Sequence, residues 1–179
     1  MFIPVILGTA RNGRQSEKVA NFVVEETKKA GYDTELIDVR DFRTDATDNT
    51  QGTPAAKNLL PKIEKADAFI IVSPEYNHGY PGELKMMIDM IYQQYATKPV
   101  GFCGVSAGGL GGARAVEQLR QIVVELHMVP IREALYFPVV QNLFDDKGVM
   151  KNPDAYKDRL KVFFNELTAY AGALKASRK

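Results

Sequence analysis

The sequence is poor in the residues that build disulfides and metal centres. It has a single cysteine, Cys103, and two histidines, His78 and His127, which lie far apart in the chain. One cysteine cannot form an internal disulfide, and a zinc site needs several Cys or His ligands close together. We therefore expect neither a disulfide nor a metal site.

The chain also lacks an excess of charge of either sign and lacks a long apolar run. Its 23 Lys and Arg residues against 22 Asp and Glu residues leave a formal net charge of +1 at pH 7. Nucleic acids and anionic bilayers are bound through a field of positive charge, so we expect neither partner. No apolar run approaches the ~20 residues that span a bilayer, and the apolar start Met1–Leu7 has no basic segment before it. We expect a cytoplasmic protein without a secretory signal.

What is present is the composition of an ordinary globular protein. Hydrophobic residues make up 45% and charged residues 25% of the 179 residues. This composition excludes intrinsic disorder, and the length suits one domain over residues 1–179.

Short apolar runs alternate with helical patterns along the chain. The runs read as strands buried on both faces, as a parallel sheet requires: Phe2–Leu7, Thr34–Val39, Ala68–Ser73, Val100–Ser106 and Val129–Phe137. The other segments have the length and period of helices: Ser16–Ala30, Pro54–Lys65, Gly82–Tyr95, Gly111–His127 and Pro153–Ala176. This alternation predicts an α/β fold with a doubly wound, five-stranded parallel sheet and helices on both faces. We favour the flavodoxin-like strand order 2-1-3-4-5.

In such sheets ligands bind beyond the carboxyl ends of the strands, at the point where the strand order reverses. The loop after the first strand, residues 8–16, has hydroxyls at Thr9 and Ser16, two arginines and the start of a helix. These groups favour a phosphate site, although Ser16 could instead only cap the helix. The spacing of Gly8 and Gly13 is that of a P-loop, but Arg14 and Gln15 stand where Lys and Ser or Thr are needed. Nucleoside triphosphate hydrolysis is therefore disfavoured.

The loop after the third strand, residues 73–82, contains two prolines, two glycines, Tyr76 and Tyr80. A stiff loop with aromatic faces suits a planar heterocycle. Alternatively, Tyr76 packs on a neighbouring helix.

The loop after the fourth strand contains Gly-x-Ser-x-Gly at 104–108, which formally matches the nucleophile motif of serine hydrolases. The required histidine should follow Ser106, and the only candidate, His127, shares its predicted helix with the acids Glu117 and Glu125. A helix of that length places His127 too far from Ser106 for a triad. A glycine-rich ligand loop is favoured, and a hydrolase using Ser106 is kept as an alternative.

Five motifs carry a resemblance to a known family: Gly-Thr-x-Arg at 8–11, Ser-Pro-Glu-Tyr-Asn at 73–77, Pro-Gly-x-Leu-Lys at 81–85, Gly-x-Ser-x-Gly-Gly-x-Gly-Gly-Ala-Arg at 104–114 and the turn at 144–148. They resemble the NADPH-dependent FMN reductases, a family that also includes quinone, azo-dye and chromate reductases. The likeness covers essentially the whole chain.

The resemblance implies a set of site residues and a reaction. The FMN phosphate would be held by Thr9, Arg11, Gln15 and Ser16; the isoalloxazine would be lined by Pro74, Glu75, Tyr76 and Asn77, with Ser106 on the other side. NADPH or NADH would pass hydride to FMN N5, and the electrons would go on to a quinone, azo, metal-oxyanion or free-flavin acceptor. Because the flavin carries this chemistry, we name no catalytic side chain.

The resemblance also implies a homodimer or tetramer that pairs through the third and fourth helices. Apolar side chains at Met86, Met90, Ala113 and Val124 lie off the core-facing stripes of these helices, which suggests a partner surface. The alternative from another functional class is a flavodoxin-type electron carrier without NAD(P)H turnover. Flavodoxins typically have an acidic surface, whereas this chain has Arg11, Arg14 and a pI of about 7.8.

Overall fold

The structure, a computed structural model, describes residues 1–47 and 50–178. In this part of the chain one parallel sheet has the strand order β2-β1-β3-β4-β5. Its strands are β1 (Val5–Leu7), β2 (Leu36–Asp38), β3 (Phe69–Pro74), β4 (Pro99–Val105) and β5 (Val129–Phe137). The predicted α/β fold and strand order are confirmed.

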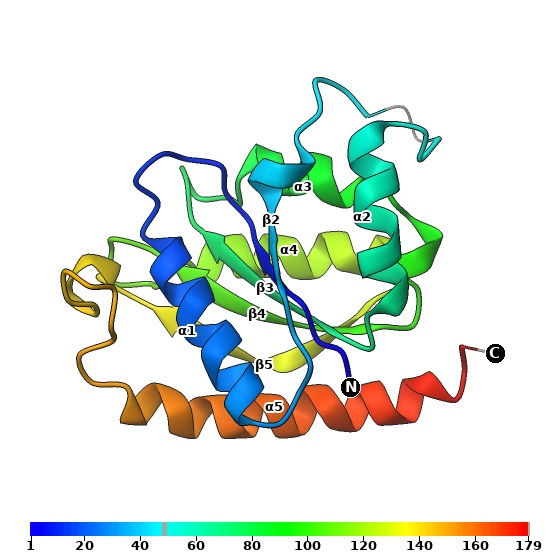
Figure 1. The fold of residues 1–179 in the computed structure, drawn as a ribbon. Coiled ribbons are helices and arrows are strands. Elements are labelled where there is room, and N and C mark those ends of the chain that lie inside the picture. Colours follow the sequence, from blue (N-terminus) through cyan, green and yellow to red (C-terminus); the bar gives the residue numbers. More distant parts are fainter. Residues whose placement is uncertain (48–49, 179) are drawn as a thin grey trace.

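Helices cover both faces of the sheet (Figure 1). Helices α1 and α5 lie on one face, and α2, α3 and α4 lie on the other (Figure 1). Their bounds are α1 (Ser16–Lys29), α2 (Pro54–Lys65), α3 (Gly82–Ile88), α4 (Ala113–Glu125) and α5 (Asp154–Lys175). Short 3-10 turns occur at η1 (Val39–Phe42), η2 (Gln93–Tyr95) and η3 (Val140–Asn142).

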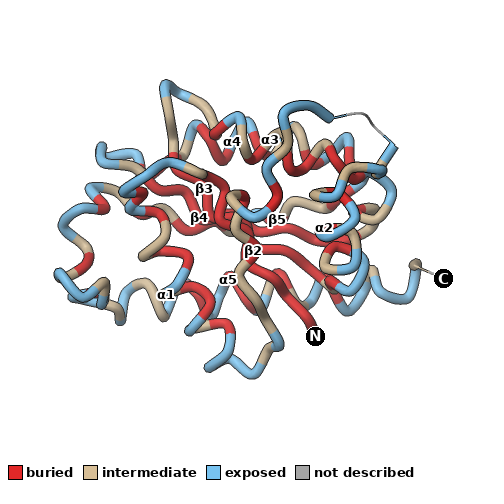
Figure 2. The backbone as a smooth tube through the Cα atoms, turned by 45° about the horizontal axis from the view of Figure 1, so that its top comes forward, coloured by how far each residue is buried: buried red, intermediate tan, exposed pale blue. Residues whose placement is uncertain are grey.

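The sheet separates two hydrophobic cores because successive strand residues point to opposite faces. On β3, Ile71 packs toward α2–α4, whereas Ile70 and Val72 pack toward α1 and α5. Figure 2 shows the buried strands at the centre, with helices buried only on their inner sides. The continuous apolar runs of the sequence are explained by burial on both faces.

The third helix is shorter than predicted. The pattern over Gly82–Tyr95 predicts one helix, but α3 ends at Ile88, and the N–H of Met90 donates to the carbonyl of Met87 at 3.3 Å, three residues back. This tighter winding changes which side chains face inward. Met90 is only 4% exposed and lies in the core, so its predicted place on a partner surface is wrong.

The segment after β2 begins with a helical turn that the sequence does not predict. The sequence predicts a loop over 41–53, and η1 already covers Val39–Phe42. Residues 43–47 and 50–53 contain no helix or strand, and residues 48–49 lie outside the described residues.

The strand order reverses between β1 and β3, which lie side by side with Leu7 opposite Val72. The helices after these two strands lie on opposite faces of the sheet, so the loops that follow the strands separate there. Figure 1 shows the loop after β1 at the side of the sheet away from both chain termini. The carboxyl edge of the sheet therefore holds the three loops selected from the sequence.

Candidate functional site

The loop after β1 is held by buried ionic contacts. The Arg14 side chain is 1% exposed, and it donates to the carbonyl of Thr9 and to both carboxylate oxygens of Asp38 at the end of β2. Burial alone would raise the pKa of Asp38, but hydrogen bonds from Arg14 and from the N–H of Arg40 lower it. Arg14 is thus occupied within the protein and braces the loop.

A second arginine, Arg40 in the turn η1 directly after β2, supports the same loop. Arg40 donates from Nε to the carbonyl of Ala10 at 3.2 Å and from Nη2 to the carbonyl of Arg11 at 2.6 Å. The N–H of Ala10 lies 3.4 Å from a carboxylate oxygen of Glu83 on α3. Nothing in the sequence around Arg40 marks this role, because the contact spans 29 residues.

The start of α1 has free hydrogen-bonding capacity. Gln15 occupies the N-cap position and makes no side-chain cap, so the first N–H groups of the helix have no side-chain partner there. Ser16 is 2% exposed, and its hydroxyl has no hydrogen-bond partner within the described residues. A buried hydroxyl without a partner costs free energy unless a ligand satisfies it. The Ser16 hydroxyl and the helix start together fit an anion such as a phosphate.

Thr9 and Arg11 both contact Tyr76 of the second loop. The hydroxyl oxygens of Thr9 and Tyr76 are 3.0 Å apart, and the N–H of Arg11 donates to the Thr9 hydroxyl at 3.2 Å. The Arg11 guanidinium lies 3.6 Å from the centre of the Tyr76 ring. Within the described residues Arg11 makes no ion pair, so its charge is available to an anion.

The second loop reverses direction in a tight turn. Tyr76 and Gly79 exchange two backbone hydrogen bonds of 2.8 and 3.0 Å, and Asn77 and His78 between them have φ values of 50° and 70°. Positive φ at both central positions is the type I′ pattern, which Asn and His tolerate better than most residues. The Asn77 side chain sits at this exposed tip.

Glu75 is bound to the start of α4. Its side chain is 5% exposed; one oxygen accepts from the Arg114 guanidinium and the other from the Arg114 backbone N–H at 3.2 Å. Arg114 also lies 2.8 Å from Nε2 of His78. The sequence alone suggests a solvated Glu75, and only the fold brings Arg114 to it.

The third loop is closed on itself. The Ser106 hydroxyl donates to the carbonyl of Gly108 at 2.9 Å. A Cβ at Gly104 would lie 2.6 Å from the carbonyl oxygen of Gly111, so glycine is needed there for close packing of backbone on backbone. Of the two histidines, His127 lies against Tyr92 at the far edge of the sheet and His78 lies against Arg114. Among residues 1–47 and 50–178, no catalytic triad forms around Ser106.

These loops enclose a cavity of about 220 Å³. Seven of the nine predicted site residues line it: Arg11, Gln15, Ser16, Pro74, Glu75, Tyr76 and Ser106. Thr9 and Asn77 do not line it: Thr9 is fully buried, with its hydroxyl bound to that of Tyr76, and Asn77 is exposed at the tip of the turn. The lining residues that sequence reasoning missed are Gly13, Arg14, Val105, Ala107 and Val140.

A wider hollow of about 420 Å³ lies between α1 and α5. Its charged walls pair within their own helices, as Lys29 does with Glu26 and Lys161 with Asp158. Such exposed pairs leave no unsatisfied group for a ligand, so the smaller cavity at the sheet edge is the candidate site.

Two further classes of site find no support in residues 1–47 and 50–178. There, no three His, Cys, Asp or Glu side chains gather as a metal site would require. In the same ranges, every helix is too short or too polar to cross a bilayer.

The comparison with family models and with curated relatives identifies the family. The model of the NADPH-dependent FMN reductase family matches residues 1–141. An NAD(P)H-dependent FMN reductase of Schizosaccharomyces pombe is 32% identical over 159 residues, which is 80% of this chain and 78% of the yeast protein. An NAD(P)H:quinone oxidoreductase of Solanum tuberosum is 32% identical over 181 residues, 95% of this chain and 92% of the potato protein.

Solved structures show the same fold. The flavoenzyme NAD(P)H:(acceptor) oxidoreductase FerB of Paracoccus denitrificans superposes with a TM-score of 0.75 at 20% identity, covering 98% of this chain and 97% of the other. A flavodoxin of Pseudomonas aeruginosa gives a TM-score of 0.59 at 18% identity, covering 98% and 99%.

Proposed function

The chain belongs to the NADPH-dependent FMN reductase family and is an NAD(P)H-dependent flavin oxidoreductase, and we propose that its FMN binds in the cavity between the loops after β1, β3 and β4. The unpartnered, buried hydroxyl of Ser16 at the start of α1 is the observation that carries this assignment. A phosphate there would accept from that hydroxyl and from the free N–H groups of the helix, next to the positive end of the helix dipole.

The charges around the cavity suit a dianionic phosphate. Arg14 is neutralised by Asp38, and Glu75 is neutralised by Arg114. Arg11 is the lining cation that keeps its charge, and its guanidinium can form a forked contact with phosphate oxygens. Gln15 supplies an amide at the same end. Thr9 acts by fixing Tyr76 and the Arg11 backbone.

The rest of the cavity offers walls of the kind that suit a planar ring. Pro74, Glu75 and Tyr76 come from the end of β3 and the loop after it, and Ser106 and Val140 come from the segments after β4 and β5. Bound FMN supplies the hydride and electron-transfer chemistry. The protein would orient the ring and exclude water. Glu75 is bound to Arg114 and the Ser106 hydroxyl to the Gly108 carbonyl, so we assign neither a role as acid or base.

The size of the cavity bears on how the second substrate reaches the flavin. Pockets that bury a whole ligand of this size usually hold ~300–1,000 Å³, and this cavity holds about 220 Å³. A flavin bound here would keep part of its ring accessible to NAD(P)H and then to an acceptor. We take a quinone as that acceptor, because relatives across bacteria and plants are named quinone reductases.

We also propose a homodimer that pairs through the ends of α3 and α4. Tyr92 is 39% and Val124 is 59% exposed, which leaves apolar side chains at this surface although Met90 is in the core. Light scattering at micromolar concentration tests the proposal, and a monomer mass would refute it.

Titration of the apoprotein with FMN, monitored by the fluorescence of the flavin itself, tests the cofactor assignment. We expect saturable quenching at one FMN per chain, and oxidation of NADPH that depends on both FMN and a quinone. Flavin binding without NADPH oxidation would favour the electron-carrier alternative. Absence of flavin binding, or labelling of Ser106 by a fluorophosphonate, would overturn the proposal.

A further inference from the structure

The Glu75 carboxylate depends on one residue for both of its partners. The Arg114 guanidinium binds one oxygen, and the Arg114 backbone N–H donates to the other at 3.2 Å. That N–H belongs to the first turn of α4, whose N-cap, Gly112, has no side chain to satisfy it. Glu75 therefore caps α4 from a different loop, and Arg114 neutralises it there.

The same helix holds the turn that follows Tyr76. Arg114 Nη1 lies 2.8 Å from His78 Nε2, and the Gln118 amide donates to the His78 carbonyl at 2.9 Å. A guanidinium only donates, so Nε2 of His78 is the acceptor in this contact. The first two turns of α4 thus fix the loop that carries both Glu75 and Tyr76.

Resting on the FMN site proposed above, we propose that Arg114 is a positioning residue that holds Glu75 and the 76–79 turn against the flavin and cancels the negative charge of Glu75. The carboxylate is 5% exposed and lines the cavity, whereas Arg114 is 44% exposed and reaches it from outside. Without Arg114 a largely buried anion would face the cofactor, where charges interact strongly.

This charge balance affects reduction as well as binding. Reduction by hydride would add one negative charge to a flavin held here, and the protein charges near the ring would set how favourable that is. An uncompensated Glu75 would oppose the added charge. Arg114 therefore raises the midpoint potential of bound FMN relative to a protein that has Glu75 alone.

The test compares R114A, R114K and the double variant R114A/E75Q with the wild type at pH 8. FMN affinity and the midpoint potential of bound FMN are measured for each, with thermal melting as the check on folding. R114A is expected to bind FMN about tenfold more weakly and to show a lower potential, because an unpaired, largely buried carboxylate remains. R114K keeps the charge but loses the forked contact, so its potential should stay nearer the wild-type value. The double variant has no bare carboxylate and should recover the potential.

R132A is the matched control, since Arg132 forms an exposed pair with Glu133 on β5 and does not line the cavity. It should leave FMN affinity and potential unchanged. If the wild type binds no FMN, the proposed function fails. If the wild type binds FMN and R114A matches it in affinity and potential, this inference alone is overturned. Equal losses in R114A and R114A/E75Q would show a merely structural role and would also overturn it.

Discussion

The hydroxyl of Thr9 lies 3.0 Å from the hydroxyl of Tyr76, although 67 residues separate them in the chain. The contact joins the loop after β1 to the loop after β3 at the point where the strand order reverses. A hydrogen bond between side chains therefore links the two loops, beside the contact of Arg11 with the Tyr76 ring.

Replacing Tyr76 by Phe tests this link. The ring remains available to Arg11, but the hydrogen bond to Thr9 is lost, so we expect FMN affinity to fall roughly three- to tenfold, as for loss of one hydrogen bond. Isothermal calorimetry measures the change. Y170F, at a tyrosine 43% exposed on α5, is the control and should bind FMN as the wild type does. Unchanged affinity in Y76F would show that the link is dispensable.

Replacing Ser16 by Ala should have opposite effects on the free and the flavin-bound protein. The hydroxyl is buried without a partner, so its removal should stabilise the apoprotein by about 1 kcal/mol. The same change should weaken FMN binding about tenfold, because the phosphate loses a donor. Urea unfolding of the apoprotein and FMN titration measure the two effects.

S177A is the control for Ser16, since Ser177 bonds the Leu174 carbonyl at the end of α5, far from the cavity. A loss of apoprotein stability in S16A would mean that the hydroxyl has a partner in the folded chain. An unchanged FMN affinity would remove Ser16 from the phosphate site.

The Arg14–Asp38 pair predicts a dependence of stability on acid. The pKa of Asp38 is lower in the folded protein than its ordinary value of 3.8, so its ionised form stabilises the fold above that pH. This contribution is lost as the pH falls below 3.8 through the lower folded pKa. D38N should therefore be less stable than the wild type by roughly 2 kcal/mol at pH 7, because buried Arg14 would keep, among the described residues, only Glu17, whose side chain is 47% exposed, as an ionic partner.

The stability difference between wild type and D38N should shrink as the pH falls below 3.8 and through the lower pKa of Asp38 in the folded protein, because Asp38 is then protonated in both states. Urea unfolding at each pH measures it. D146N removes an exposed carboxylate and should track the wild type throughout. A difference that is constant with pH would contradict the assigned role of the ion pair.

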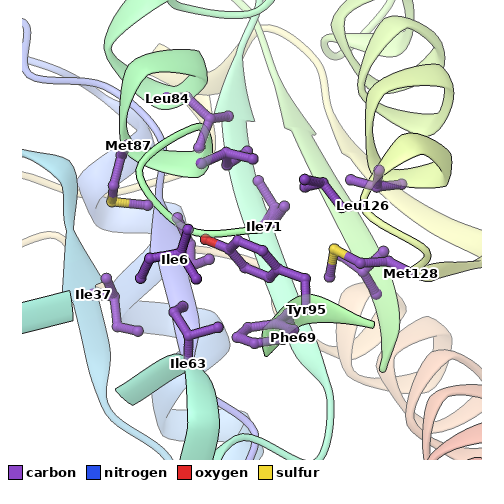
Figure 3. Packing of buried hydrophobic residues seen from close by; sticks show 14 of the residues in the cluster. Ile6, Ile37, Ile63, Phe69, Ile71, Leu84, Met87, Tyr95, Leu126 and Met128 are labelled. Atoms are coloured by element: carbon purple, nitrogen blue, oxygen red, sulfur yellow. The ribbon is translucent and has the colours of Figure 1, made fainter. Parts of the chain in front are cut away.

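Tyr95 predicts a stabilising substitution in the core. Figure 3 shows its ring next to Phe69, with the hydroxyl directed toward Ile6. The hydroxyl has no hydrogen-bond partner among the described residues, and burial raises the pKa of Tyr95, so it stays protonated. Y95F should raise the free energy of unfolding by about 1 kcal/mol.

Thermal melting checks the Tyr95 prediction, and FMN affinity should not change because Tyr95 precedes β4, at the edge of the sheet opposite the cavity. The matched control is Y92F: the Tyr92 hydroxyl is at the surface, 3.4 Å from His127 Nε2, and its loss should give no gain. A less stable Y95F protein would imply a hydrogen bond to the hydroxyl.

The sequence was sufficient to predict the sheet because its strands carry local signals, and the loops of the cavity follow the strands. The individual residues of the site were named through the resemblance to the FMN reductases, and their binding of FMN stays a prediction. Runs such as Ile70–Val72 show burial on both faces, and the hydroxyls and arginines of residues 8–16 directly precede or begin a helix. General rules of connection limit the strand order to a few possibilities, and the flavodoxin-like order favoured among them is confirmed. That order determines which loops meet.

The contacts that the sequence did not reveal are those made across the fold. Composition alone does not show which arginine of the loop after β1 is free: Arg14 binds Asp38, whereas Arg11 makes no ion pair within the described residues. Arg114 reaches Glu75 over 39 residues. The end of α3 was missed for a related reason: the apolar pattern continues past Ile88, and tertiary packing draws Met90 and Tyr95 into the core.

Arg14 and Arg40 hold the loop after β1 in place by hydrogen bonds to the carbonyls of Thr9, Ala10 and Arg11. The loop thus acquires its shape when the chain folds, before any flavin arrives, and little ordering entropy is left to be lost on association. Apoprotein from which FMN has been removed should bind FMN again on mixing, at a rate limited by diffusional association.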